Sequence, residues 1–134
     1  MNTTLAFDVY GTLIDTNGVE SLLKRFIADE AKAFSATWRA KQLEYSFRRG
    51  HMQNYVSFAV CTQQALDYSC LFHKVELNDE QKNQLMAIYA VLPAFAEVKE
   101  ALEKFKAKGF RLFAFSPTNF SNNVTTPFVS INVP

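Results

Sequence analysis

Two short hydrophobic runs enclose a long stretch of helical periodicity. Leu5 to Phe7 form an apolar run that stops at Asp8 and a glycine-containing turn, which is typical of a buried strand. Between residues 18 and 92, hydrophobic side chains recur every three or four positions, which predicts a block of helices. Residues 110–115 form a second apolar run and predict a second buried strand.

Hydrophobic stripes divide the block into four predicted helices and indicate a fifth before the second strand. Ser35 is a candidate N-cap of the second helix, and residues 78–81 resemble a capping box that opens the fourth. Pro93 closes the block, and Gly109 is the expected C-cap of the fifth helix. The five stripes are Val19, Leu22, Leu23, Phe26 and Ile27; Phe34, Trp38 and Tyr45; Tyr55, Phe58, Ala59, Thr62, Ala65, Leu66, Ser69 and Cys70; Leu85, Ile88, Tyr89 and Leu92; and Phe95, Val98, Leu102 and Phe105.

The order of strand, helical block, helix and strand favours an α/β fold with a helical insertion after the first strand. Residues 117–134 differ from the rest, because they hold no charged side chain and three of the four prolines. Residues 128–133 have a strand-like composition, but no helical pattern links them to the preceding strand. A parallel crossover normally needs a dozen or more residues, usually with a helix, so their place in the fold stays open.

Composition excludes several classes of protein. A chain of 134 residues with 49% hydrophobic residues and a net charge of +1 is neither disordered nor a basic nucleic-acid-binding arm. It has no stretch suited to span a membrane and no basic segment typical of a secretory signal. We therefore expect a cytoplasmic protein without nucleic-acid or membrane partners. Cys61, Cys70 and the two isolated histidines lack the spacing of a zinc site.

Both predicted strands end in a residue with useful chemistry, Asp8 and Ser116. Active sites of open α/β sheets lie beyond the carboxyl ends of the strands. A carboxylate is ionised at neutral pH and can act as a nucleophile without an activating base. Gly11 permits close approach of a substrate anion to the turn after Asp8, and Thr12 is placed to hydrogen-bond Asp8.

The string Phe-Asp-Val-Tyr-Gly-Thr-Leu-Ile-Asp at residues 7–15 resembles the first motif of the haloacid dehalogenase superfamily. Phosphatases of that superfamily place a second Asp two residues after the nucleophile, where it protonates the leaving alcohol. Here that position is Tyr10, which resembles the 2-haloacid dehalogenase branch. Halide leaves as a stable anion and needs no proton, so the missing acid is consistent with dehalogenation.

The helical block extends the resemblance. Residues 38–45, Trp-Arg-Ala-Lys-Gln-Leu-Glu-Tyr, are similar to a helix of L-2-haloacid dehalogenases in which the Arg receives the leaving halide. That role falls on Arg39, whose guanidinium is permanently charged and weakly hydrated. The family usually has Gln next, whereas this chain has Ala40. Residues 54–58 resemble the following helix, in which Phe58 would line an apolar substrate pocket or simply pack in the core.

Residues 110–116 resemble the second motif, a hydrophobic strand ending in a hydroxyl residue. The resemblance implies that Ser116, with the backbone of Val9 and Tyr10, holds the substrate carboxylate. The family commonly continues Ser-Asn-Gly, but Pro117 here removes one backbone N–H donor. Asn119 would replace the usual Asn only if the loop shifts.

The resemblance implies a Rossmann-like parallel sheet core, incomplete here, with an inserted helical cap. The core would comprise residues 1–15 and 94–134, and the cap residues 16–93. It also implies a small 2-haloacid substrate, no metal and no other cofactor, and homodimers, since family members are often dimers. The catalytic set would be Asp8, Thr12, Arg39 and Ser116.

Two family roles have no candidate in this sequence. The third motif supplies a Lys that balances charge and the fourth an acidic residue that helps to activate water, but no charged residue follows Ser116. We therefore expect weak or absent turnover, with stalling at the aspartyl ester.

A non-catalytic, truncated dehalogenase-like protein that acts by association through an exposed sheet edge is the alternative. A phosphatase of the same superfamily is disfavoured by Tyr10.

Overall fold

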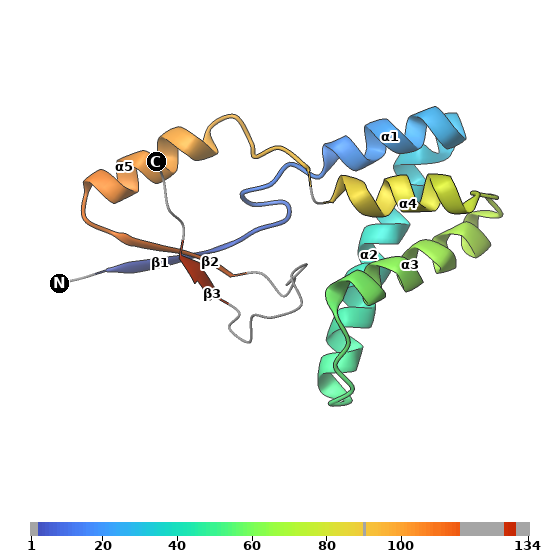
Figure 1. Cartoon of the computed structure of the whole chain (residues 1–134), viewed down its shortest axis with the longest axis horizontal. Helices are drawn as coiled ribbons and strands as arrows, with labels where there is room; N and C mark the ends of the chain where they lie inside the picture. The colour runs from blue at the N-terminus through green and yellow to red at the C-terminus, as the bar shows by residue number, and fades with distance from the viewer. Residues whose placement is uncertain (1–2, 90, 116–127, 131–134) are drawn as a thin grey trace. The chain divides into compact units, whose positions relative to one another are not determined.

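The computed structural model describes residues 3–89, 91–115 and 128–130 (Figure 1). The chain forms two compact units. The first, which we call the sheet unit, comprises residues 1–16 and 92–134, and the second, the helical unit, comprises residues 17–91. In chain order the elements are β1 (Thr4–Asp8), α1 (Asn17–Ile27), the short 3-10 helix η1 (Ala28–Glu30), α2 (Ala31–His51), α3 (Phe58–His73), α4 (Asp79–Ile88), α5 (Val98–Ala107), β2 (Arg111–Phe115) and β3 (Phe128–Ser130).

The sheet unit contains three strands in the order β1-β2-β3. β1 and β2 are parallel, with Thr4 paired to Arg111 and Asp8 to Phe115. This confirms the α/β class that the order of elements favours and the parallel sheet that the resemblance implies. β3 is antiparallel to β2, with Phe115 paired to Phe128. An antiparallel neighbour needs no helical crossover, so the lack of a helical pattern before residue 128 in the sequence is compatible with the place of β3 in the sheet.

Helix α5 covers one face of the strands (Figure 1). Leu102 on α5 and Leu112 on β2 form the buried centre of the hydrophobic core between the helix and the strands. The half-buried hydrophobic residues packed around them are Leu5, Phe7, Val98, Phe105 and Phe110. Gly109 follows the helix with φ of +81°, a conformation that favours glycine, as the predicted helix end requires. Phe95 was expected within this helix but precedes it, because its backbone N–H bonds to the Leu13 carbonyl at 3.1 Å.

The helical unit has a hydrophobic core of its own, built from all four helices. Its fully buried large side chains include Leu23 on α1, Phe34 and Trp38 on α2, Leu66 on α3 and Leu85 on α4. These residues all belong to the predicted stripes, so the helical periodicity is confirmed at the core positions.

Two details of the helix boundaries differ from the sequence prediction. Ser35 is not an N-cap, since α2 begins at Ala31 directly after η1 and contains Ser35 in its second turn. Tyr55 precedes α3 and is 78% exposed, although it continues the apolar spacing of that helix. α3 instead begins at Phe58, with the Ser57 side chain accepting a hydrogen bond from the Val60 N–H. The Ser57 cap therefore sets the start of the helix, even though the spacing of apolar residues extends back to Tyr55.

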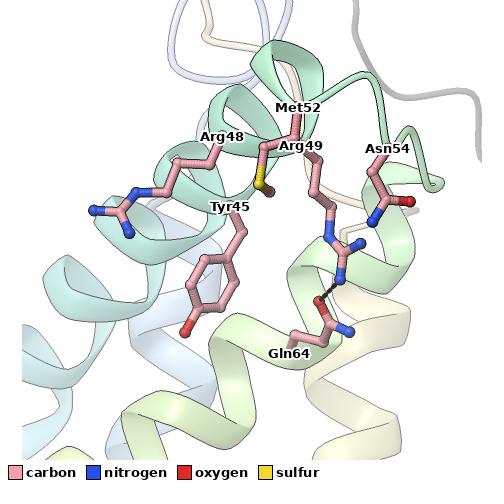
Figure 2. A pocket seen from close by; sticks show the side chains of 6 residues that line it. All are labelled: Tyr45, Arg48, Arg49, Met52, Asn54 and Gln64. Carbon is pink, nitrogen blue, oxygen red and sulfur yellow. Dashed lines mark hydrogen bonds between the residues drawn. The ribbon is translucent and has the colours of Figure 1, made fainter.

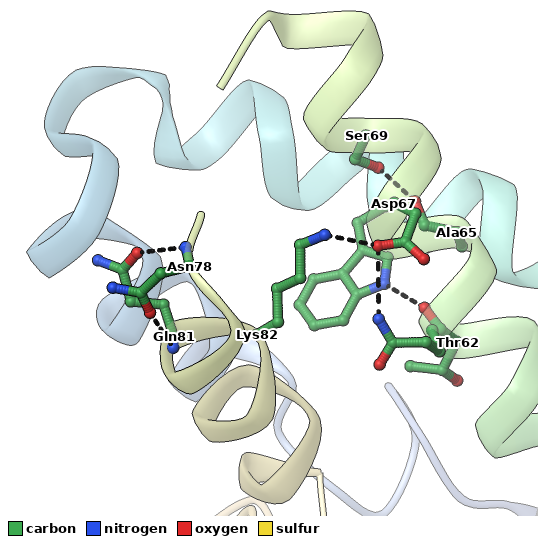
Figure 3. A network of polar contacts seen from close by, with 9 residues as sticks. Thr62, Ala65, Asp67, Ser69, Asn78, Gln81 and Lys82 are labelled. Atoms are coloured by element: carbon green, nitrogen blue, oxygen red, sulfur yellow. Dashed lines mark hydrogen bonds and ion pairs between the residues drawn. The ribbon is translucent and has the colours of Figure 1, made fainter. Parts of the chain in front are cut away.

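The capping box at the start of α4 is present as predicted. The Asn78 side chain accepts from the Gln81 N–H at 2.8 Å, and the Gln81 side chain accepts from the Asn78 N–H at 3.0 Å (Figure 3). Lys82 joins α4 to α3 through an ion pair of 2.8 Å with Asp67 (Figure 3). Within the described ranges, no helix has both the length and the apolar character needed to cross a membrane.

Candidate active site

The turn after β1 presents Asp8, the last residue of the strand. Backbone N–H groups of Thr12, Leu13 and Ile14 all bond to the Val9 carbonyl, at 3.2, 2.9 and 2.9 Å. Gly11 has φ of +89° and donates its N–H to Ile14 at 2.9 Å. The turn is thus closed by four backbone hydrogen bonds, and its geometry depends on glycine at position 11.

Thr12 is the side chain that this turn brings to Asp8. Its hydroxyl Oγ1 lies 3.5 Å from Asp8 Oδ2 and donates to that carboxylate oxygen. This contact was expected from the sequence. Asp8 is exposed and Val9 and Tyr10 are half-buried, so the carboxylate stands at an accessible strand end.

The parallel register places the end of β2 beside Asp8, because Phe115 is its pairing partner. Carboxyl ends of adjacent parallel strands form the site edge of open α/β sheets. Ser116, Pro117 and Asn119, which the sequence assigns to the substrate carboxylate, lie outside the described residues.

Arg39 belongs to the helical unit, on α2, and is half-buried. Its Nη1 donates a hydrogen bond to Gln42 Oε1 at 2.7 Å. Phe58 is the first residue of α3 and is 4% exposed in the core of the same unit. The structure therefore groups the predicted site residues into two sets, Asp8 with Thr12 in one unit and Arg39 with Phe58 in the other.

The sequence interpretation missed Gln42, which is fully buried. The signal was present, since position 42 is four residues after the buried Trp38 and so lies on the same face of α2. A glutamine on the buried face of a helix needs polar partners, and that need is what would have identified it.

Metal-binding side chains do not gather in the described parts of the chain, where no three His, Cys, Asp or Glu residues form a cluster. Cys61 and Cys70 are free and buried, and burial raises the pKa of both thiols. Their environment favours the protonated, unreactive form.

The helical unit also has an open pocket of about 400 Å³ near the end of α2. Figure 2 shows the side chains that line it: Tyr45, Arg48, Arg49, Met52, Asn54 and Gln64. Arg49 donates to Gln64 at 2.9 Å, and Arg48 pairs with Glu44 at 2.8 Å. Of the predicted site residues that the structure describes, none lines this pocket.

Comparison with known proteins adds an independent observation. Residues 3–128 match the family model of haloacid dehalogenase-like hydrolases. An (S)-2-haloacid dehalogenase of Pseudomonas fluorescens is 37% identical over 103 residues, which are 77% of this chain and 45% of that protein. The chain spans about half the length of the curated relatives it matches.

Solved structures agree with the sequence relatives. The crystal structure of an L-2-haloacid dehalogenase superimposes with a TM-score of 0.85 at 30% identity, covering 88% of this chain and 54% of that one. An L-2-haloacid dehalogenase from Xanthobacter autotrophicus, solved with chloropropionic acid covalently bound, gives a TM-score of 0.79 at 25% identity. That match covers 90% of this chain and 48% of the other.

Proposed function

The chain belongs to the haloacid dehalogenase-like hydrolases, and we propose that it acts on short-chain L-2-haloacids, displacing the halide with Asp8. The observation that carries the proposal is the strand-end turn, where an exposed carboxylate has Thr12 beside it and Tyr10 in place of a second carboxylate. The names of the relatives support the substrate class.

The first step is a direct displacement. An oxygen of the Asp8 carboxylate forms a bond to C2 of the haloacid while the carbon–halogen bond breaks and its electron pair leaves with the halide. The product is an ester between Asp8 and the acid, inverted at C2. Arg39 receives the halide, and Ser116 with the backbone after Asp8 holds the substrate carboxylate. Covalently bound chloropropionic acid in the Xanthobacter enzyme supports this step.

The second step is hydrolysis of the ester. Water attacks the Asp8 side-chain carbonyl carbon, the ester bond to that carbon breaks, and the 2-hydroxy acid leaves with the free carboxylate restored. This step benefits from a base that takes the proton of water.

Tyr10 separates this proposal from phosphatase chemistry. A phosphatase must protonate a leaving alcohol, and a phenol is a weaker acid for that purpose than the carboxylic acid that phosphatases of the superfamily place there. We therefore expect no magnesium-dependent release of phosphate from phosphate monoesters.

A chloride-release assay with L-2-chloropropionate tests the proposal. We compare the unaltered chain with Asp8→Asn, which keeps the size of the side chain but removes the nucleophile. Asp29→Asn, an exposed position in η1, is the matched control. Chloride release that is lost in Asp8→Asn and kept in Asp29→Asn is the expected result.

Equal chloride release by all three proteins would refute Asp8 as nucleophile. No release by any of them would favour the alternative, a non-catalytic chain that acts by association.

A further inference from the structure

A line of buried hydrogen bonds links Arg39 to the start of α3. Arg39 Nη1 donates to Gln42 Oε1 at 2.7 Å, and Gln42 Nε2 donates to Thr62 Oγ1 at 2.7 Å. The Thr62 hydroxyl donates in turn to the Phe58 carbonyl at 2.8 Å. Gln42 and Thr62 are both fully buried. The line therefore runs through the interior of the helical unit and reaches a half-buried guanidinium.

The direction of each hydrogen bond follows from donor and acceptor chemistry. A hydroxyl has one hydrogen, and that of Thr62 is used by the Phe58 carbonyl. The Thr62 oxygen must then accept, so the NH2 group of the Gln42 amide faces Thr62. The amide oxygen of Gln42 consequently faces Arg39. An amide turned the other way would set N–H donors against the donors of the guanidinium.

Trp38 anchors the same part of α3. Its indole Nε1 donates to the Thr62 carbonyl at 2.9 Å, and the ring is 1% exposed. Within the described residues, no buried side-chain nitrogen or oxygen lacks a hydrogen-bond partner. A fully satisfied buried network holds one arrangement, because any rotation leaves a polar atom without a partner.

The chemistry of Gln42 suits an anion site. A Glu at this position would also bind Arg39, but its negative charge would offset the guanidinium charge. A neutral amide oxygen holds the guanidinium in place without adding a negative charge beside it.

We propose that Gln42, oriented by Thr62, is a positioning residue that holds the Arg39 guanidinium ready for the departing halide. The inference rests on the proposed function, which makes Arg39 the halide acceptor. It assigns roles in halide capture to two buried residues that do not themselves touch the substrate.

Chloride binding to the full chain tests the inference without requiring turnover. The broadening of the 35Cl nuclear magnetic resonance line on titration with protein measures it, and Arg39→Gln identifies the part due to Arg39. Thr62→Val removes the hydroxyl but keeps the shape, whereas Thr62→Ser keeps the hydroxyl. We expect chloride affinity through Arg39 to fall about tenfold in Thr62→Val, the order expected when the buried hydrogen bond that orients Gln42 is lost, and to be retained in Thr62→Ser.

Gln42→Glu is the second variant. It preserves side-chain length and packing, and we expect it to weaken chloride binding because a carboxylate offsets the Arg39 charge. Urea denaturation followed by Trp38 emission confirms that each variant is folded under the conditions of the titration. If Thr62→Val does not fold, Gln42→Met takes its place, because it removes the amide that binds both Arg39 and Thr62 but keeps the length of the side chain, and the same loss of chloride affinity is expected.

The outcomes separate the inference from its premise. If Arg39→Gln leaves the chloride signal unchanged, Arg39 does not bind halide and that part of the proposed function fails. If Arg39→Gln abolishes the signal while folded Thr62→Val and Gln42→Glu bind chloride like the unaltered chain, the positioning role is refuted and the proposed function stands.

Discussion

Asp8 and Gln42 show what can and cannot be recognised from single residues in this sequence. Asp8 stands out because an apolar run ends on a carboxylate and is followed by a glycine turn and a hydroxyl residue, and the structure shows the Thr12 contact. Gln42 has no such local setting. Its importance comes from Thr62, twenty positions away on another helix, so only the packing of α2 against α3 reveals it.

The two cysteines give a prediction at the residue scale. Burial raises the pKa of Cys61 and Cys70 above the ordinary value of 9.0, so both remain thiols at neutral pH. We expect the native chain to react with a disulfide reagent much more slowly than the urea-unfolded chain, measured by release of the coloured thiolate. Equal rates in the two states would contradict the burial of these thiols.

The raised pKa values of Cys61 and Cys70 also make the stability of the folded chain depend on pH. A raised folded-state pKa means that the folded chain holds the thiol protons more tightly than the unfolded chain. This contribution to stability is fully present below pH 9.0 and is lost as the pH rises through the folded-state pKa. Substitution of both cysteines by serine should remove this part of the alkaline loss of stability.

At the scale of elements, the hydrophobic periodicity located the helices, and side-chain caps set the first residues of α3 and α4. The predicted box at Asn78 is present because its reciprocal bonds are local and need only residues three positions apart. The prediction of Ser35 as an N-cap was wrong because η1 leads directly into α2, which begins at Ala31 and has no side-chain cap. The prediction that Tyr55 belongs to the buried face of α3 was wrong because the helix begins after the Ser57 cap.

Asn78→Ala tests the energetic role of the capping box. We expect a loss of about 1 kcal/mol in the free energy of unfolding, since the variant removes the side-chain acceptor for an otherwise orphan N–H of α4. Urea denaturation followed by Trp38 emission measures it, because this is the only tryptophan and it lies in the same unit. Trp38 also contacts Tyr89 next to the end of α4, with ring centroids 5.4 Å apart.

Asn83→Ala is the matched control for this prediction. Asn83 is exposed in the interior of α4, where alanine is the better helix former, so no loss of stability is expected. An equal loss in the two variants would mean that the box at Asn78 does not stabilise the helix.

At the scale of the whole molecule, the α/β class and the family could be predicted from sequence, and the position of the last strand could not. The α/β class follows from two apolar runs on either side of a helical insertion, and the family resemblance implies the parallel sheet in which β1 and β2 pair. The antiparallel orientation of β3 depends on a pairing between Phe115 and Phe128 that no sequence period indicates.

The central claim is that Asp8 forms a covalent ester by displacing halide. Intact mass spectrometry of the chain after incubation with L-2-chloropropionate tests it most directly, with peptide mapping to locate the change. We expect a mass increase equal to the substrate less hydrogen chloride, located on Asp8 and absent from Asp8→Asn. Protein of unchanged mass together with no release of chloride would contradict the claim.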